Sequence, residues 1–165
     1  MRAFFKKHAK LGKSGVSLLE VMIATGIVFA ALAAIVGSYQ TFLSAGLANA
    51  KSVQAAFLLE EGIEAVLSLR DSDWSSFASL GGAGDRYLSF QSGIWTASAE
   101  ESMIDQTFAR KFTVSSVYRD AEDNIASSGT LDSNIKKVEV SVSWLTNRGT
   151  TTRNLSRYVA NIFEL

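Results

Sequence analysis

The chain has neither cysteine nor proline among its 165 residues, and its only histidine is His8. Without cysteine no disulfide can stabilise the fold. A chain that loses His8 also lacks the ligands of ordinary zinc sites and the partners of serine–histidine and cysteine–histidine nucleophilic sites. No phosphate-binding loop is present either. We therefore expect no enzyme and no cofactor.

Acidic residues are missing from the first 15 positions, and charge of either sign is nearly missing from the next 35. The first 15 residues are basic, and Glu20 is the only charged residue between Ser14 and Ala50. Removing residues 1–15 leaves 11 basic and 16 acidic residues, a net charge of −5. Nucleic-acid binding depends on excess Lys and Arg, so we predict no specific nucleic-acid partner. The basic residues of this first segment are Arg2, Lys6, Lys7, Lys10 and Lys13.

Residues 16–36 form a mostly apolar run of 21 residues. As a helix rising about 1.5 Å per residue, this run spans about 30 Å, the thickness of a bilayer core. The basic segment before it favours an orientation with the N-terminus in the cytoplasm and the C-terminus outside. A single carboxylate near one end of such a segment is energetically costly, so Glu20 is predicted to have a function.

The helical pattern continues beyond the apolar run, and no proline interrupts it between residues 17 and 70. We predict one helix over residues 17–70, apolar on all sides in its first half and amphipathic in its second. The residues that recur at helical spacing in the second half are Ala55, Leu59, Ile63, Val66 and Leu67. Asp71-Ser72-Asp73 is predicted to end the helix.

After the predicted helix the sequence favours a short turn or helix at 74–80, a loop at Gly81–Gly84 and then period-two alternation. We expect a hairpin of residues 86–90 and 94–96 and a final strand over 151–163 after a turn at 147–149. Two further strands are indicated by apolar faces made of Phe108, Phe112, Val114 and Tyr118, and of Val138, Val140, Val142 and Trp144. One long helix packed on three to five antiparallel strands is an α+β fold.

The basic leader, Gly15, Val16, Ser17-Leu18-Leu19 and Glu20 together resemble the prepilin signature of type IV pilins and pseudopilins. The resemblance implies cleavage between Gly15 and Val16 by a prepilin peptidase, N-methylation of Val16, and a pilin-like fold. The family usually has Phe where this chain has Val16. The resemblance also implies that Glu20 pairs with the new α-ammonium of the same or a neighbouring subunit and helps to set the register of assembly.

The resemblance implies four segments: a basic leader at 1–15, a transmembrane and filament-core helix at 16–37, an amphipathic helix at 38–70, and a β-rich extracytoplasmic domain at 71–165. The implied function is that of a minor pilin or pseudopilin in a type IV pilus-like or type II secretion-like filament. Its expected partners are other pilin subunits, the prepilin peptidase, the assembly platform and the inner membrane. Its expected location is the cytoplasmic membrane, and then a periplasmic or extracellular filament. Motility, adhesion, DNA uptake and secretion remain open.

Two other interpretations fit the N-terminus. Ala31-Leu32-Ala33 matches the cleavage rule of a secretory signal, which would give a secreted protein that begins at Ala34. Against it, Glu20 interrupts the apolar region, which also continues past that site. Alternatively, the chain is an uncleaved, membrane-anchored binding module that keeps its leader.

The remaining charged clusters are predicted to be solvated. Asp120, Glu122, Asp123 and Asn124 resemble the beginning of a calcium loop, but Ile125 stands where such a loop needs glycine, so we expect a turn and no metal. Exposed loops or strand faces are also expected for two other groups. These are the acids Glu100, Glu101 and Asp105, and the bases Lys136, Lys137, Arg148, Arg153 and Arg157.

Overall fold

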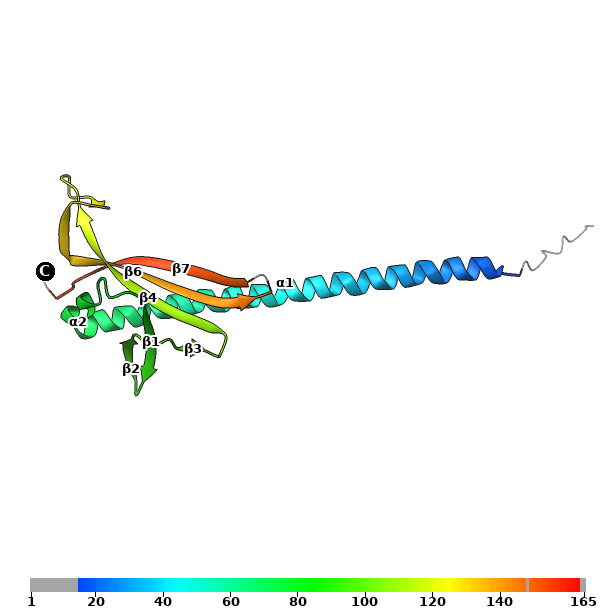
Figure 1. The fold of residues 1–165 in the computed structure, drawn as a ribbon, viewed down its shortest axis with the longest axis horizontal. Helices are drawn as coiled ribbons and strands as arrows, with labels where there is room; N and C mark the ends of the chain where they lie inside the picture. The colour runs from blue at the N-terminus through cyan, green and yellow to red at the C-terminus, as the bar shows by residue number, and fades with distance from the viewer. Residues whose placement is uncertain (1–14, 148, 164–165) are drawn as a thin grey trace, which may run out of the picture. The chain divides into compact units, whose positions relative to one another are not determined.

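A computed structural model describes residues 15–147 and 149–163. The chain divides into two compact units, Met1–Gly46 and Leu47–Leu165. The described part of the first unit is almost entirely helix, the beginning of α1 (Leu18–Ser72). The second unit contains the rest of α1, the short helix α2 (Trp74–Ser79) and the strands (Figure 1).

Helix α1 begins and ends close to the predicted bounds of 17 and 70. At its start the Ser17 carbonyl accepts hydrogen bonds from the backbone N–H groups of Glu20 (2.9 Å) and Val21 (3.2 Å). At its end the predicted stop is confirmed: α1 finishes at Ser72, and Asp73 caps α2 by accepting a bond from the Ser75 N–H at 2.9 Å. An Asp side chain stabilises a helix start because it satisfies a free N–H group.

The strands form one antiparallel sheet, which confirms the α+β fold. The sheet has seven strands, more than the three to five predicted: its main path has the order β2-β1-β4-β6-β7, and two short strands, β3 and β5, pair with β4. The bounds are β1 (Arg86–Gln91), β2 (Ile94–Ser98), β3 (Met103–Ile104), β4 (Phe108–Arg119), β5 (Ile125–Ala126), β6 (Thr130–Thr146) and β7 (Gly149–Ala160).

The predicted hairpin is β1 and β2, joined by the two residues Ser92 and Gly93. Both adopt positive φ, 54° and 82°. Two-residue turns of this kind match the right-handed twist of paired strands, and glycine adopts positive φ at no steric cost. The turn therefore fixes the register, in which Phe90 lies opposite Trp95 with ring centroids 4.9 Å apart.

The core lies between the second half of α1 and one face of the sheet. Alternation in β6 is as predicted: Val138, Val140 and Val142 are fully buried, and Trp144 is 3% exposed. Phe77 of α2 also enters this core. The predicted apolar positions of α1 that are buried here are Ala55, Leu59, Ile63 and Val66.

Two strand predictions need correction. Tyr118 does not share the face of Phe112 and Val114, because the β4–β6 register shifts between Ser116 and Val117. An irregularity of this kind reverses the inward and outward positions that follow it, so Val117 is buried and Tyr118 is 36% exposed. The last strand ends at Ala160 rather than residue 163, and the turn before it lies between the paired residues Thr146 and Gly149. Arg148 lies outside the described residues.

Gly62 allows α1 to approach the sheet closely. A Cβ atom at this position would lie 2.7 Å from Cγ1 of Val140 and 3.2 Å from Cδ of Arg110. Val140 is fully buried and β-branched, so its methyl group has little freedom to move aside. The helix–sheet distance therefore depends on the absence of a side chain at residue 62.

We expect Gly62→Ala to lower the free energy of unfolding by about 1–3 kcal/mol, because overpacking a dense core forces its neighbours to shift. Gly46→Ala is the matched control, since nothing lies within 4 Å of the added carbon there. In the control there is no steric overlap, so only the higher helix propensity of alanine changes the free energy of unfolding. Chemical denaturation of both variants in detergent, followed by tryptophan fluorescence, measures the difference. Equal stabilities would contradict the close approach.

Candidate functional site

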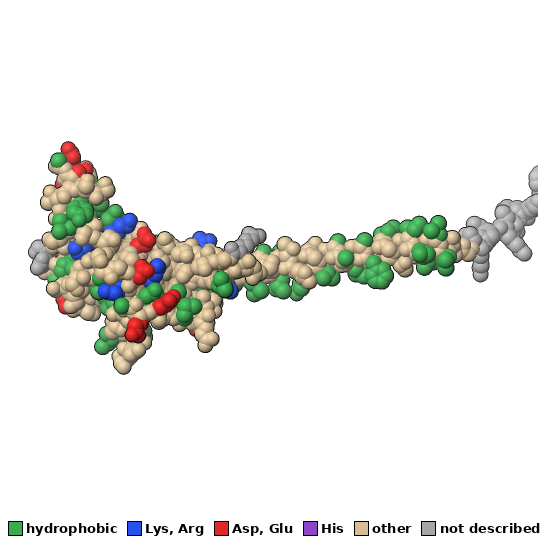
Figure 2. Space-filling model, in the orientation of Figure 1, with side chains coloured by type: hydrophobic (Ala, Val, Ile, Leu, Met, Phe, Trp, Pro, Cys, Tyr) green, Lys and Arg blue, Asp and Glu red, His purple; other side chains and the backbone are tan. Residues whose placement is uncertain are grey.

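The first part of α1 carries a large uncovered apolar surface. Every residue from 15 to 50 is exposed, and an 18-residue window of the helix has a mean hydropathy of 2.4 with none of it buried. Figure 2 shows hydrophobic side chains recurring along this segment. By length and composition α1 can therefore cross a membrane. So large an apolar surface needs cover, either by lipid or by other protein.

Three hydroxyl groups in the apolar part of this segment are bonded to the helix itself. Thr25 donates to the Val21 carbonyl at 2.8 Å, and Ser38 donates to the Ala34 carbonyl at 2.9 Å. Thr41 does the same one turn later, toward Gly37 at 3.0 Å. A polar group in an apolar environment is costly unless it is hydrogen-bonded. These hydroxyls therefore need no outside partner for the segment to be buried.

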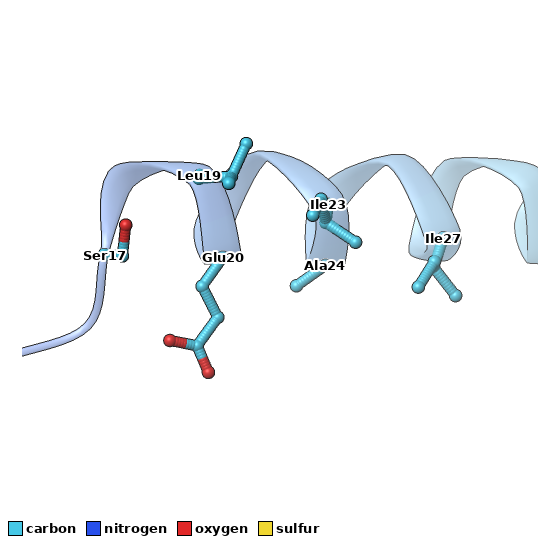
Figure 3. Close-up of a pocket in the computed structure, with 6 residues that line it drawn as sticks. All are labelled: Ser17, Leu19, Glu20, Ile23, Ala24 and Ile27. Atoms are coloured by element: carbon cyan, nitrogen blue, oxygen red, sulfur yellow. The ribbon is translucent and has the colours of Figure 1, made fainter.

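Glu20 lies in the first turn of α1, where a carboxylate interacts favourably with the positive end of the helix dipole. Figure 3 shows its carboxylate extending outward from the helix. The residues that line the shallow groove around it are Ser17, Leu19, Glu20, Ile23, Ala24 and Ile27. Within the described part of the chain, Glu20 has no ion-pair or hydrogen-bonding partner for its side chain, so its carboxylate is available to another group.

The proposed cleavage position lies immediately before the helix. Gly15 and Val16 are exposed and precede the first helical residue, Leu18. A peptidase needs an accessible, non-helical backbone at the bond it cuts, and both conditions hold here. Val16 lies four positions before Glu20 in the sequence, which is about one helical turn. Residues 1–14 of the predicted leader, which include its five basic side chains and His8, lie outside the described residues.

Sequence analysis missed Arg110, which connects the sheet to the helix. Its side chain is only 5% exposed and forms an ion pair with Glu61 at 2.9 Å. It also donates to the Leu58 carbonyl at 3.3 Å, and its guanidinium carbon lies 5.3 Å from the centre of the Trp95 ring. Arg110 thus joins three elements, α1, β4 and β2, through contacts that a planar cation makes well.

A signal for Arg110 was present in the sequence. Phe108 and Phe112 face the core, and the period of two in a strand places Arg110 between them on the same face. The prediction of a solvated position is wrong for Lys136, which shares the face of Val138 and is 8% exposed. Alternation should have assigned both cations to the inner face of the sheet.

The acidic loop after β4 is a hydrogen-bonded turn. Oδ1 of Asp120 accepts from the N–H groups of Glu122 (3.1 Å) and Asn124 (2.8 Å), which confirms the predicted turn. In residues 15–147 and 149–163, no group of three or more His, Asp or Glu side chains is placed to hold a metal ion. The oxygens of Asp120 are used to close the turn.

Arg119 contacts two acidic residues, Asp132 and Asp123, at this end of the sheet. Its Nε donates to Oδ2 of Asp132 at 2.7 Å, and a second nitrogen donates to the Asp123 carbonyl at 2.7 Å. The hydrogen bond from Arg119 lowers the pKa of the Asp132 carboxyl below its usual value. The same bond holds β4 and β6 together beyond the register shift.

Comparison with known proteins gives no match: no protein-family model fits the chain, and no curated protein or solved structure is significantly similar to it.

Acidification should loosen this end of the sheet. Because folding lowers the pKa of Asp132, its contribution to stability is complete above the unfolded-state pKa, about 3.9. That contribution is lost as pH falls through the lower folded-state pKa. The protection factors of the amides of residues 117–119 and 130–132, each calculated against the unstructured rate at the same pH, should fall on acidification. In Asp132→Asn these protection factors should already be low at neutral pH and should change less. Identical pH profiles for both proteins would contradict the assignment.

Proposed function

We propose that this protein is a subunit of a type IV pilus-like or type II secretion-like filament, of the minor pilin or pseudopilin kind. In this proposal a prepilin peptidase removes residues 1–15 and the new N-terminus at Val16 is methylated. The apolar half of α1 first anchors the subunit in the cytoplasmic membrane and later packs against the same segment of other subunits. The sheet-bearing unit lies outside the membrane.

One observation carries the proposal: a single helix is uncovered and apolar in its first half and forms part of a protein core in its second half. A plain membrane anchor needs only the first half. Here the helix continues without a break into the core, so one helix contains both the anchor and the part that packs on the sheet. A filament built by packing of helices needs this continuity.

Glu20 supplies the polar contact of the proposal. Cleavage before Val16 creates an α-ammonium four residues before Glu20 in the sequence. Two opposite charges in poorly solvated surroundings gain strongly from pairing, and either one left alone is destabilising. The ammonium of the same chain and that of a neighbouring chain both meet this need, and a pairing between chains sets their relative position.

The N-terminus of the mature protein tests this function. On co-expression with a prepilin peptidase, intact-mass analysis should show a chain that begins at Val16 and carries one added methyl group. Gly15→Leu should stay uncut, because a bulky side chain obstructs the scissile bond. A wild-type chain that still begins at Met1 supports an anchored binding module, and a chain that begins at Ala34 supports secretion. Either result refutes the proposal.

Removing the carboxylate should separate processing from assembly. We expect Glu20→Ala to be cut normally but to enter sheared filaments about tenfold less, the equivalent of about 1.4 kcal/mol. Glu20→Gln, which keeps the shape and loses the charge, should be similarly impaired. Glu64→Ala is the control, because this exposed glutamate lies in the second half of α1. Normal incorporation of Glu20→Ala would remove Glu20 from the mechanism.

A further inference from the structure

The two lateral sides of the sheet carry opposite charges. Strands β2 and β7 are the ends of the main strand order (Figure 1). Strand β7 contains Arg153 and Arg157 and no acid. On the opposite side of the sheet β2 itself carries no charge, and Glu100, Glu101 and Asp105 flank β3, which pairs with β4. Residues 94–107 contain no base. Among the residues that the structure describes, none of these five side chains forms an ion pair.

Each edge also exposes apolar side chains beside its charges. On β7 the exposed fractions are 39% for Leu155 and 50% for Tyr158. On the opposite side Met103, which lies between Glu101 and Asp105 in the sequence, is 53% exposed. We call the first set, with Arg153 and Arg157, the basic edge, and Met103, with the three acids, the acidic edge. An apolar centre with charges around it is the usual composition of a protein interface.

The strand register places the two edges at the same level of the sheet. Leu155 lies opposite Val140, Val140 opposite Phe112, and Phe112 opposite Arg86. The next residue of β1, Tyr87, pairs with Ser98 on β2. One end of this row is Leu155, which lies between Arg153 and Arg157. The other end is Ser98, the last residue of β2, two positions before Glu100. A second copy moved sideways along the row brings its acidic edge against the basic edge of the first.

We propose that the basic edge of one subunit binds the acidic edge of the next. The inference deepens the proposed function and rests on it, because subunits anchored in one membrane point the same way and present opposite edges to each other. A two-fold contact would instead place the arginines of two β7 strands together, which is repulsive. A contact between unlike surfaces leaves one edge free at each end, and repetition generates an open helical array.

Charge on an edge strand also selects the partner. An uncovered edge invites pairing with any available strand, and charged side chains discourage it. Charges of one sign reject a second copy of the same edge and accept the opposite one. Arg153 and Arg157 thus direct the order of subunits as well as stabilising their contact.

The lack of cysteine makes a direct test possible in the full-length chain. Ala99→Cys places a thiol at the acidic edge and Ser156→Cys places one at the basic edge; both positions are exposed. In membranes from cells that express both variants with the assembly machinery, mild oxidation should give a disulfide-linked dimer. Either variant alone should give little. In the control, Ser115→Cys replaces Ser156→Cys. Residue 115 is exposed but lies on the central strand β4, so this pair should give little dimer.

Charge reversal tests the electrostatic part. Arg153→Glu with Arg157→Glu in the Ser156→Cys chain should lower the dimer yield about fivefold, as expected when two exposed ion pairs become repulsive. Glu100→Lys with Glu101→Lys in the partner chain should restore it. High salt should lower the yield of the unmodified pair, because it screens exposed charges. A yield that reversal leaves unchanged would overturn the proposal.

The outcomes also separate this inference from the proposed function. A chain cut at Val16 and present in filaments, yet giving no mixed dimer, refutes the edge contact alone. Strong dimer formation by Ser156→Cys by itself also refutes the contact, since it indicates a two-fold arrangement. A chain that is never cut refutes the filament function, whatever the cross-linking result.

Discussion

The close packing of α1 on the sheet is the interaction on which the rest of the structure depends. Gly62 brings the helix against Val140, and Arg110 connects β4 to the helix and to Trp95 of the hairpin. No disulfide supports this unit, so burial of apolar side chains and the contacts of the buried Arg110 hold its elements together. The hairpin edge and the β7 edge keep their relative positions because both belong to this one packed layer.

The first half of α1 differs from this packed unit, because its apolar residues are exposed in the described part of the chain. A globular unit gains free energy by burying apolar residues in its own core. Here the same gain requires burial in lipid or against other subunits. The proposed filament function joins these two halves: the core fixes the shape of the subunit, and the uncovered helix supplies the adhesive surface. Glu20 then confers specificity on a surface that is otherwise only apolar.

Local patterns predicted most of the fold, and long-range packing decided the rest. The ends of α1, the Ser92-Gly93 hairpin and the alternation of β6 follow from turn residues and periodicity over a few positions. The exposure of Tyr118 does not, because a register shift depends on how β4 pairs with β6. At the candidate site, charge and residue order alone single out Glu20 and Gly15. Cleavage at Gly15 and pairing of Glu20 stay predictions, because they involve a cut chain and a neighbouring subunit, which a single intact chain does not contain.

The internally bonded hydroxyls of α1 have a consequence for the energetics of transfer. Thr25, Ser38 and Thr41 already satisfy their donors within the helix. Moving this segment from a bilayer to a bundle of similar helices is therefore a transfer between two apolar environments. It does not break the hydrogen bonds of these three hydroxyls. Such a transfer is close to balanced in free energy, since hydrocarbon chains and leucine side chains are almost equally apolar. In the proposed filament, a modest mechanical input is then enough to move the helix between bilayer and bundle in either direction.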